Sequence, residues 1–181
     1  MSGVELAEWI QPFLAAIMAV WTFVSHFPII GNVFWAAIAA FGFAMLFNAP
    51  KYALPYCALI GALGYAARAG LVNAGVGIIQ ATLLAALLIG TLATICARRF
   101  AVSEVVFAIS PAIPMVPGSY VYKAVMHIVV VANAPHLEHE NEELLMAAFN
   151  ESAKAAMIIL LLSFGIALPG LVWSTFRRRA D

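Results

Sequence analysis

The sequence predicts an all-helical protein that crosses a membrane several times. Of its 181 residues, 65% are hydrophobic and 10% are charged, whereas a soluble domain is roughly 45–50% apolar and about 25% charged. Apolar runs long enough for a helix to cross the hydrocarbon layer, about 20 residues each, recur along the chain. These observations predict about five transmembrane helices, preceded by one further apolar or amphipathic helix at the N-terminus.

Residues 1–28 form the first expected unit. The stretch from Ile10 to Val24 is apolar, but Glu5, Glu8 and Pro12 lie before or within it. No basic segment precedes it as in a cleaved signal peptide, so we expect it to stay in the mature chain. It fits a helix that crosses the membrane, lies in the interface or packs obliquely on the bundle, and its placement stays open.

Residues 29–176 are expected to form a single helical bundle. The expected spans run from Gly31 to Phe47, Tyr52 to Ala67, Leu71 to Ala97, Val102 to Val131 and Glu143 to Trp173. Turn residues separate them: Asn48-Ala49-Pro50 after the first span, and Ala69-Gly70 with Asn73 after the second. The polar segment from Asn133 to Asn141 separates the fourth span from the fifth.

The basic residues predict the orientation of the bundle. With five spans, one side carries Lys51, Arg98, Arg99 and the basic tail of residues 177–181. The other side receives Arg68 and the acidic segment 136–140. Because loops rich in lysine and arginine stay in the cytoplasm, we expect the C-terminus to be cytoplasmic.

Three prolines and a glycine interrupt the fourth span between Ser110 and Ser119, in the order Ser-Pro-Ala-Ile-Pro-Met-Val-Pro-Gly-Ser. Proline cannot continue a helix, and backbone groups freed inside a bilayer must be satisfied by protein, water or a ligand. Many transporters build a substrate site from such unwound backbone. We interpret Pro114, Pro117 and Gly118 as part of a substrate path, with a merely kinked helix as the alternative. A bulky residue at Gly118 is expected to abolish transport.

Polar side chains follow the break. Ser119 comes directly after Gly118, and the spacing of Tyr120, Lys123 and His127 by three and four places them on one helical stripe. A lysine inside a membrane is costly and should face a partner, the bundle interior or water. It can hold a substrate carboxylate together with the amides at the start of the half-helix. A lysine paired with a carboxylate or reaching the surface is an equally good interpretation.

Arg68 ends another helical face, on which Cys57, Gly61 and Gly64 precede it at intervals of three and four residues. Small residues let helices approach closely in lipid, so this face is interpreted mainly as a packing surface. Arg68 either extends to the membrane surface or contacts an anion near a vestibule.

Glu151 is the candidate for proton coupling. It lies in a polar group of the fifth span, three residues before Lys154, with which it can pair. If it is buried, desolvation favours its protonated form, as a proton carrier needs. A solvated or interfacial carboxylate is the interpretation that we prefer.

Motifs for other chemistry are missing. The segment containing His136, Glu138, His139 and Glu140 does not have the spacing of zinc hydrolases, so we expect an exposed acidic loop and no metal. Cys57 and Cys96 lie in apolar runs and are interpreted as inert. There is no phosphate-binding loop or nucleophile elbow. We expect neither an enzyme nor a cofactor, and zero net charge gives no argument for nucleic acid.

Four ordered motifs resemble the threonine/serine exporter family, and more narrowly the small membrane subunit of its split, two-chain form. They are Gly42–Pro50, Cys57–Gly64 with Arg68, Ile113–Gly118 and Leu168–Leu171. The resemblance implies a multi-pass protein of the bacterial inner membrane that exports threonine and serine, driven by the proton gradient. Some split systems are instead associated with succinate. Lys123 departs from the family pattern, in which a small neutral residue is expected.

The resemblance also implies a partner, the large membrane subunit of the same exporter, which carries an additional soluble domain. Assembly from copies of this chain alone is the competing arrangement. We add Asn48, from the first motif, and Arg68, from the second, to the expected substrate path. A subunit that only scaffolds a transporting partner is the rival from another functional class.

Overall fold

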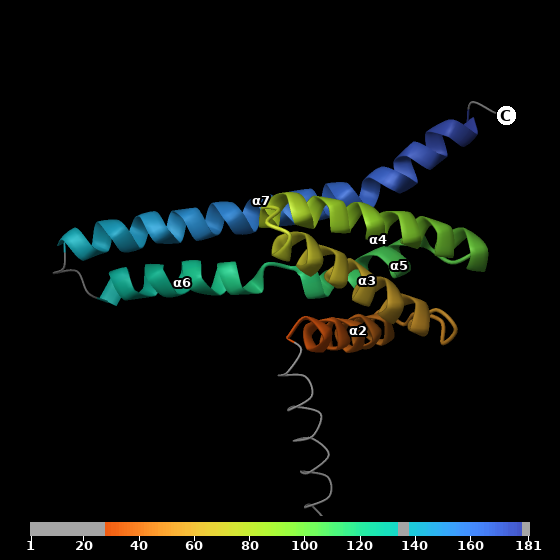
Figure 1. Cartoon of the computed structure of the whole chain (residues 1–181), viewed down its shortest axis with the longest axis horizontal. Helices are drawn as coiled ribbons and strands as arrows, with labels where there is room; N and C mark the ends of the chain where they lie inside the picture. Colours follow the sequence, from red (N-terminus) through yellow and green to blue (C-terminus); the bar gives the residue numbers. More distant parts are fainter. Residues whose placement is uncertain (1–27, 134–137, 179–181) are drawn as a thin grey trace, which may run out of the picture.

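The structure is a computed structural model that describes residues 28–133 and 138–178. Within these residues the chain is helical and contains no strand (Figure 1). The elements are α2 (Pro28–Leu46), α3 (Leu54–Asn73), α4 (Ile78–Phe100), α5 (Glu104–Ala112), the 3₁₀ turn η1 (Ile113–Met115), α6 (Gly118–Asn133) and α7 (Glu138–Arg178). The expected helix within residues 1–28 precedes α2 and lies outside the described residues.

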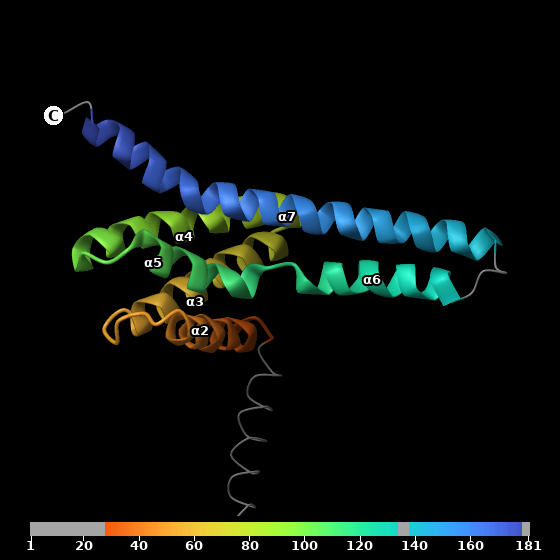
Figure 2. The same ribbon diagram turned by 180° about the vertical axis from the view of Figure 1, so that it is seen from behind.

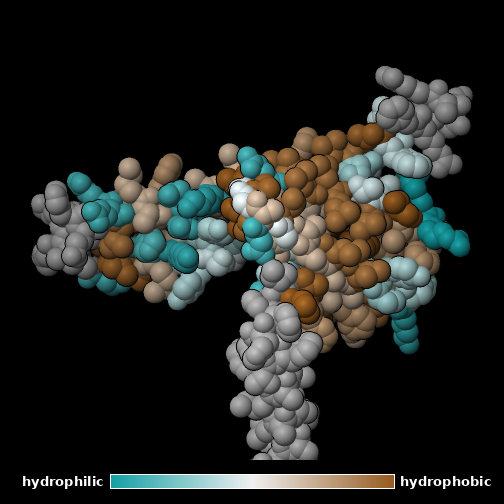
Figure 3. Space-filling view, viewed as in Figure 1, coloured by the Kyte–Doolittle hydropathy of each residue, from teal (hydrophilic) through white to brown (hydrophobic). Residues whose placement is uncertain are grey.

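Helices α2 to α5, η1 and residues 158–178 of α7 pack side by side, and we call this part the bundle (Figures 1 and 2). More than half of its core residues are alanine. The core comprises Ala44, Ala53, Cys57, Ile60, Ala85, Ala86, Ile89, Ala93, Ala97, Phe107, Ala108, Ala112, Met115 and Leu162. Small side chains allow the close helix contacts on which packing in lipid depends. The face of the bundle seen in Figure 3 is mostly hydrophobic.

Three helical segments in the described residues are long and apolar enough to cross a membrane: Leu54–Asn73, Ile78–Phe100 and Glu142–Thr175. A fourth candidate is the bent pair Glu104–Met115 with Gly118–Asn133, whose two parts meet at 50°. The apolar part of α2, Ile30–Leu46, is shorter. The architecture is that of a helical membrane protein with three to four candidate spans.

The first three helices each end at a residue in the left-handed backbone conformation. These residues are Asn48 with φ 55°, Gly75 with φ +87° and Ala101 with φ 52°. After α2, the amide of Ala49 donates to the carbonyl of Ala44 at 2.9 Å, which completes a Schellman cap. The expected turn after the first span is therefore present.

The expected turn at Ala69-Gly70 is wrong, because α3 continues through these residues to Asn73 and α4 begins at Ile78. A single glycine lowers helix stability by only about 1 kcal/mol, so a well-packed helix tolerates it. The chain instead reverses at Gly75, which adopts a positive φ without the steric penalty of a side chain.

Helix α7 has 41 residues, which at 1.5 Å per residue is about 60 Å. Its first half leaves the bundle and packs along α6, and we call α6 with residues 138–157 the hairpin (Figures 1 and 2). Two expected boundaries change: residues 138–141 are the start of α7 rather than a loop, and α7 continues to Arg178. His136 and residues 179–181 lie outside the described residues.

Candidate functional site at the helix break

The interruption between α5 and α6 follows from the proline sequence. Val116 has φ −59° and ψ 134°, an extended conformation, because the ring of Pro117 crowds the helical conformation of the residue before it. The helical hydrogen-bond pattern stops there, and the carbonyl of Met115 is not bonded to an amide one turn later. The break therefore leaves an acceptor inside the protein that needs a donor.

Arg68 supplies that donor. Its Nη1 lies 2.8 Å from the Met115 carbonyl oxygen, although 47 residues separate the two in sequence. A guanidinium has five N–H donors, so this bond leaves most of them for other acceptors. The side chain is half-buried, and no carboxylate in the described residues forms an ion pair with it.

A cavity of about 380 Å³ adjoins this contact, which falls within the range of small-molecule pockets. Its wall is formed by α2, α3, the start of α4 and the break. The polar residues of the wall are Asn32, Tyr65, Arg68, Asn73 and Ser119, and Pro114 and Pro117 are among the apolar ones. A charged group and several neutral hydrogen-bonding groups thus face one space.

The cavity brings together four residues that the sequence assigned to a substrate path: Arg68, Pro114, Pro117 and Ser119. The sequence reasoning missed Asn32, Tyr65 and Asn73. Asn32 had a usable signal, because an amide in an apolar run is costly in lipid unless it has a role. Tyr65 precedes Arg68 by three residues and so shares its helical face.

Tyr120 is not among the residues that line the cavity. The amides at the start of α6 are less available than expected. Gly118 donates to the Val116 carbonyl at 2.8 Å and Tyr120 to the Pro117 carbonyl at 3.1 Å. The amides at the start of the half-helix are those of Gly118, Ser119 and Tyr120. Of these, the Ser119 amide makes no backbone hydrogen bond within the described residues.

Gly118 itself is not crowded. A Cβ built on it would have no atom within 4 Å, and its φ is not in the left-handed region. A small side chain at this position therefore fits without rearrangement. A bulky variant is therefore expected to act on transport by obstructing the path, because the first side-chain atom at Gly118 has room.

Lys123 and His127 lie on the hairpin and do not line the cavity. Lys123 is exposed, while His127 is half-buried and its Nδ1 is buried without a hydrogen-bond partner. The predicted stripe is real as a helical face, but it leads away from Arg68. Its direction depends on the bend between α5 and α6, which the helical spacing of the residues does not encode.

Glu151 also lies on the hairpin. Its Oε1 is 3.8 Å from Lys154 Nζ, and its side chain is 19% exposed. Its Oε2 is buried and has no hydrogen-bond partner. The carboxylate is therefore more buried than the solvated interpretation expects, and a cation faces it.

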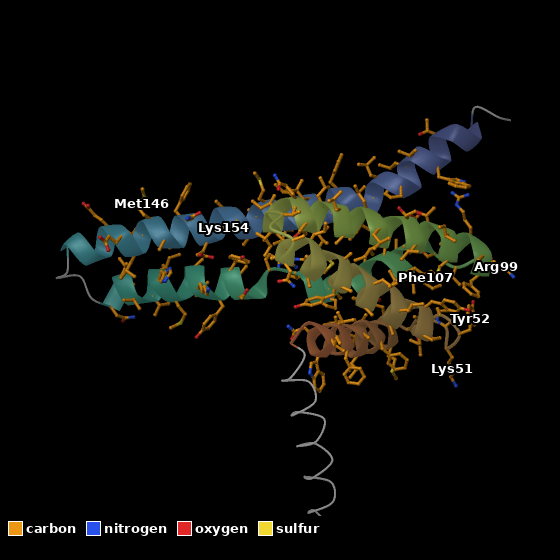
Figure 4. All side chains as sticks on the ribbon, in the orientation of Figure 1. Lys51, Tyr52, Arg99, Phe107, Met146 and Lys154 are labelled. Carbon is orange, nitrogen blue, oxygen red and sulfur yellow. The ribbon has the colours of Figure 1, made fainter. Side chains whose placement is uncertain are left out.

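Asn48 ends α2 and lies at the Lys51 end of α3, whereas Arg68 lies near the other end of that helix. Its positive φ and cap contacts give it a structural role, and it does not line the cavity. Figure 4 shows Lys51 and Arg99 at one end of the bundle, where the C-terminal end of α7 also lies. At this end Arg98 stacks over the ring of Trp173, with 4.8 Å between its guanidinium carbon and the ring centroid.

The described residues contain no group of three or more histidine, cysteine, aspartate or glutamate residues placed to hold a metal ion. Cys57 and Cys96 are free thiols. At the break, Arg68 and Ser119 offer a positive charge and hydrogen-bonding groups to the cavity.

A polar cavity beside a broken helix, within a bundle of apolar helices, is the architecture of a membrane transporter. Residues 32–172 match the family model described as "Threonine/Serine exporter, ThrE". This match covers most of the chain, and the chain therefore belongs to the threonine/serine exporter family, a family of transporters. No solved structure matches it.

Proposed function

We propose that this chain is a subunit of a secondary exporter that moves small carboxylate-bearing metabolites, threonine and serine first, out across the bacterial inner membrane. The observation that carries the proposal is Arg68, held against the helix break by Met115 and facing a cavity of about 380 Å³. An arginine without an acidic partner at such a position favours an anionic ligand.

The substrate carboxylate binds the free edge of the Arg68 guanidinium, which matches a carboxylate with two parallel hydrogen bonds. The amide and hydroxyl of Ser119 lie on the same cavity wall. Asn32, Tyr65 and Asn73 offer neutral groups for the ammonium and hydroxyl of the substrate. Succinate is the alternative substrate, and its second carboxylate needs a further cation.

Five spans fit the described helices if α2 and the bent α5–α6 segment each count as one. One side of the bundle carries Lys51, Arg99 and the C-terminus of α7. Because basic residues favour the cytoplasmic side, this supports a cytoplasmic position for it. Arg68 and the cavity then lie toward the outer side. The arrangement corresponds to a carrier whose site is open away from the cytoplasm.

The hairpin supports the proposal of a partner. Helix α6 packs extensively on α7 alone among the described elements. Its other faces expose large apolar side chains: Val121, Tyr122, Val125, Met126, Ile128 and Val129. We propose that the large membrane subunit covers this surface, with a second copy of the chain as the competing occupant.

Transport by Arg68 variants tests the function. The exporter, reconstituted with its partner subunit in vesicles, would be loaded with threonine, serine or succinate, and efflux would be compared for Arg68→Gln, Arg68→Lys and Lys123→Gln. A hydrogen bond to a charged group contributes about 1.5–3 kcal/mol, so Arg68→Gln should reduce efflux of each carboxylate by about tenfold to a hundredfold.

Lys123→Gln is the matched control, because it removes a positive charge outside the cavity. It should leave serine and threonine efflux nearly unchanged, and a selective loss of succinate efflux would assign Lys123 to dicarboxylates. Wild-type efflux by Arg68→Gln at equal abundance would refute the proposed site. It would favour the scaffold interpretation, in which the partner holds the whole pathway.

A further inference from the structure

Besides Glu151, one more carboxylate stands out in the described residues. It is that of Glu104, which lies outside the cavity where α4, α5 and α7 meet. Glu104 begins α5, at the end of that helix away from the break. Its Oε1 lies 2.6 Å from Thr94 Oγ1 on α4. A Cβ built on Gly170 of α7 would fall 2.5 Å from Oε1 and 2.8 Å from Oε2. Both carboxylate oxygens therefore lie against the α7 backbone, directly after Pro169.

The hydrogen bonds of Thr94 depend on the protonation state of this carboxylate. Thr94 Oγ1 is within 2.8 Å of the Gly90 carbonyl oxygen as well as 2.6 Å from Glu104. A hydroxyl has one hydrogen to donate. If Glu104 is protonated, it donates to Thr94, and Thr94 donates to Gly90, so both contacts are hydrogen bonds. If Glu104 is ionised, the carboxylate and the Gly90 carbonyl compete for the single hydrogen.

The ionised form is also accommodated, because Glu104 lies in the first turn of α5, where the helix dipole favours a negative charge. The packed elements bring few other charges. On α4, Arg98 stacks on Trp173 and Arg99 is exposed. No described side chain forms an ion pair with Glu104.

Helix α3 packs on α5 and carries one cation, Arg68, which bonds to Met115 at the end of this segment away from Glu104. Helix α3 brings Tyr56 and Cys57, and the Cys57 thiol donates to the Val106 carbonyl at 3.7 Å. Helix α2 and η1 carry no titratable residue. On α7, residues 163–175 around Gly170 carry no titratable side chain, and Arg177 and Arg178 follow on the same helix. Glu104 thus bonds to a hydroxyl group, and no described side chain forms an ion pair with it as Lys154 does with Glu151.

We propose that Glu104 is the residue that binds and releases the proton that drives export; this inference rests on the function proposed above. Loss of the proton draws the Thr94 hydrogen away from Gly90, a residue at which α4 packs directly against the α7 backbone. A Cβ on Gly90 would fall 2.5 Å from the Ile166 carbonyl oxygen. The nine residues of α5 connect Glu104 to the break, so a shift at this contact reaches the cavity through a short, rigid helix.

The released proton passes to water at the end of the bundle that carries Lys51 and Arg99. The loop beside Glu104 reaches the surface there, since Ala101 and Ser103 are exposed. The proton site and the substrate cavity thus lie at opposite ends of the segment formed by α5 and η1. Such separation lets each be open to a different side of the membrane.

The first experiment compares substrate transport with and without a pH gradient in vesicles that contain the whole exporter. One pH unit is equivalent to about a tenfold concentration ratio for each coupled proton, so wild-type accumulation should rise by about that factor. In Glu104→Gln, accumulation with the gradient divided by accumulation without it should fall to about one, because the amide cannot release a proton. Glu142→Gln, at an exposed carboxylate of the hairpin, is the matched control and should retain the wild-type ratio. Glu151→Gln tests the competing carboxylate.

The outcomes separate the two proposals. A wild-type exporter that moves no carboxylate substrate refutes the proposed function and this inference with it. If the wild type responds to the gradient and Glu104→Gln responds equally, the function stands and Glu104 is not the proton site. Loss of the response in Glu151→Gln alone would assign the proton to the hairpin instead.

A second measurement uses the unmodified protein and needs no transport. Dicyclohexylcarbodiimide reacts with protonated carboxyl groups in apolar surroundings, and peptide mass spectrometry identifies the labelled residue. We expect labelling of Glu104 that falls as pH rises, with much less labelling of Glu151 beside its lysine. Labelling of Glu151 and not of Glu104 would overturn the inference even if Glu104→Gln failed to fold.

Discussion

The bundle and the hairpin share helix α7, but different interactions hold them together. In the bundle, several helices surround a core dominated by alanine, and glycines lie directly against neighbouring backbones. In the hairpin, two helices meet along a narrow line of small residues, including Ala124, Ala148 and Ala155. Large apolar side chains cover much of its remaining surface, among them Met146 at 73% and Phe149 at 74% exposure.

The two parts also differ in how their charged groups are bonded. In the bundle, Arg68 bonds to Met115 and Glu104 bonds to Thr94, and the one buried polar side-chain atom without a partner among the described residues is the neutral Ser110 Oγ. The hairpin leaves Glu151 Oε2 and His127 Nδ1 buried without partners in the described residues. The substrate cavity belongs to the bundle, and the hairpin is the part whose environment another surface has to provide.

The largest expected effect comes from crowding the bundle at Gly90. In Gly90→Ala the new methyl group would meet the Ile166 carbonyl at 2.5 Å, which is backbone and cannot rotate away. Overpacking of this kind costs about 1–3 kcal/mol of folding free energy. Thermal unfolding of the purified protein in detergent, followed by size-exclusion chromatography, measures the loss.

Gly42→Ala is the control for Gly90→Ala. Gly42 lies in α2, and a Cβ added there would have no atom within 4 Å. Alanine is also the better helix former by about 1 kcal/mol. The substitution should leave stability unchanged or raise it slightly. Equal stability of the two variants would mean that α4 and α7 are not packed as closely as described.

A smaller and more selective effect is expected on the hairpin surface. Phe149→Ser should weaken association with the partner subunit, because it removes a large exposed apolar contact. The stability of the isolated chain should change by no more than about 0.5 kcal/mol, as is usual for surface positions. Co-purification of the tagged partner from membranes measures the association.

Leu59→Ser provides the comparison on the bundle, where Leu59 is 56% exposed on α3. It should reduce co-purification less than Phe149→Ser if the hairpin is the docking surface. If Leu59→Ser has the greater effect, the partner contacts the bundle, and the hairpin surface faces lipid or water.

The smallest effect is expected at the ion pair of the hairpin. Glu151 and Lys154 are 3.8 Å apart, and the lysine side chain is 39% exposed, so their attraction is screened by water and contributes at most about 1 kcal/mol. Lys154→Gln should therefore shift the unfolding temperature only slightly. A shift as large as that of Gly90→Ala would show that Glu151 is left uncompensated inside the hairpin, as in a fully buried pair.

Local sequence rules account for much of the fold. The composition and the length of the apolar runs predict a helical membrane protein, and Asn48 with Pro50 predicts the first turn. The rules place the second turn wrongly, because Gly70 is compatible with a helix and Gly75 is the residue that takes a positive φ. The choice between two nearby glycines depends on where α4 packs against α3.

The substrate cavity was predictable only in pieces. Arg68 and the proline break each had a sequence signal, but no pattern links residues 47 positions apart. Lys123 shares a helix with the break and so was the natural choice for a substrate cation. The bend between α5 and α6 carries it away from the cavity, and Arg68 takes that place from another helix.

The sequence by itself determined the helical class, an interruption between Ser110 and Ser119 and the distribution of basic residues, because hydropathy, proline stereochemistry and charge are properties of single residues and their neighbours. The structure keeps Pro111 and Pro114 in helical turns and places the break at Val116 and Pro117. The tertiary structure decided that the Met115 carbonyl, freed by the break, accepts from Arg68, and that the Glu104 carboxylate bonds to Thr94. Those outcomes depend on helix directions and close glycine contacts. The pairings of Arg68 with Met115 and of Glu104 with Thr94 arise from that packing alone.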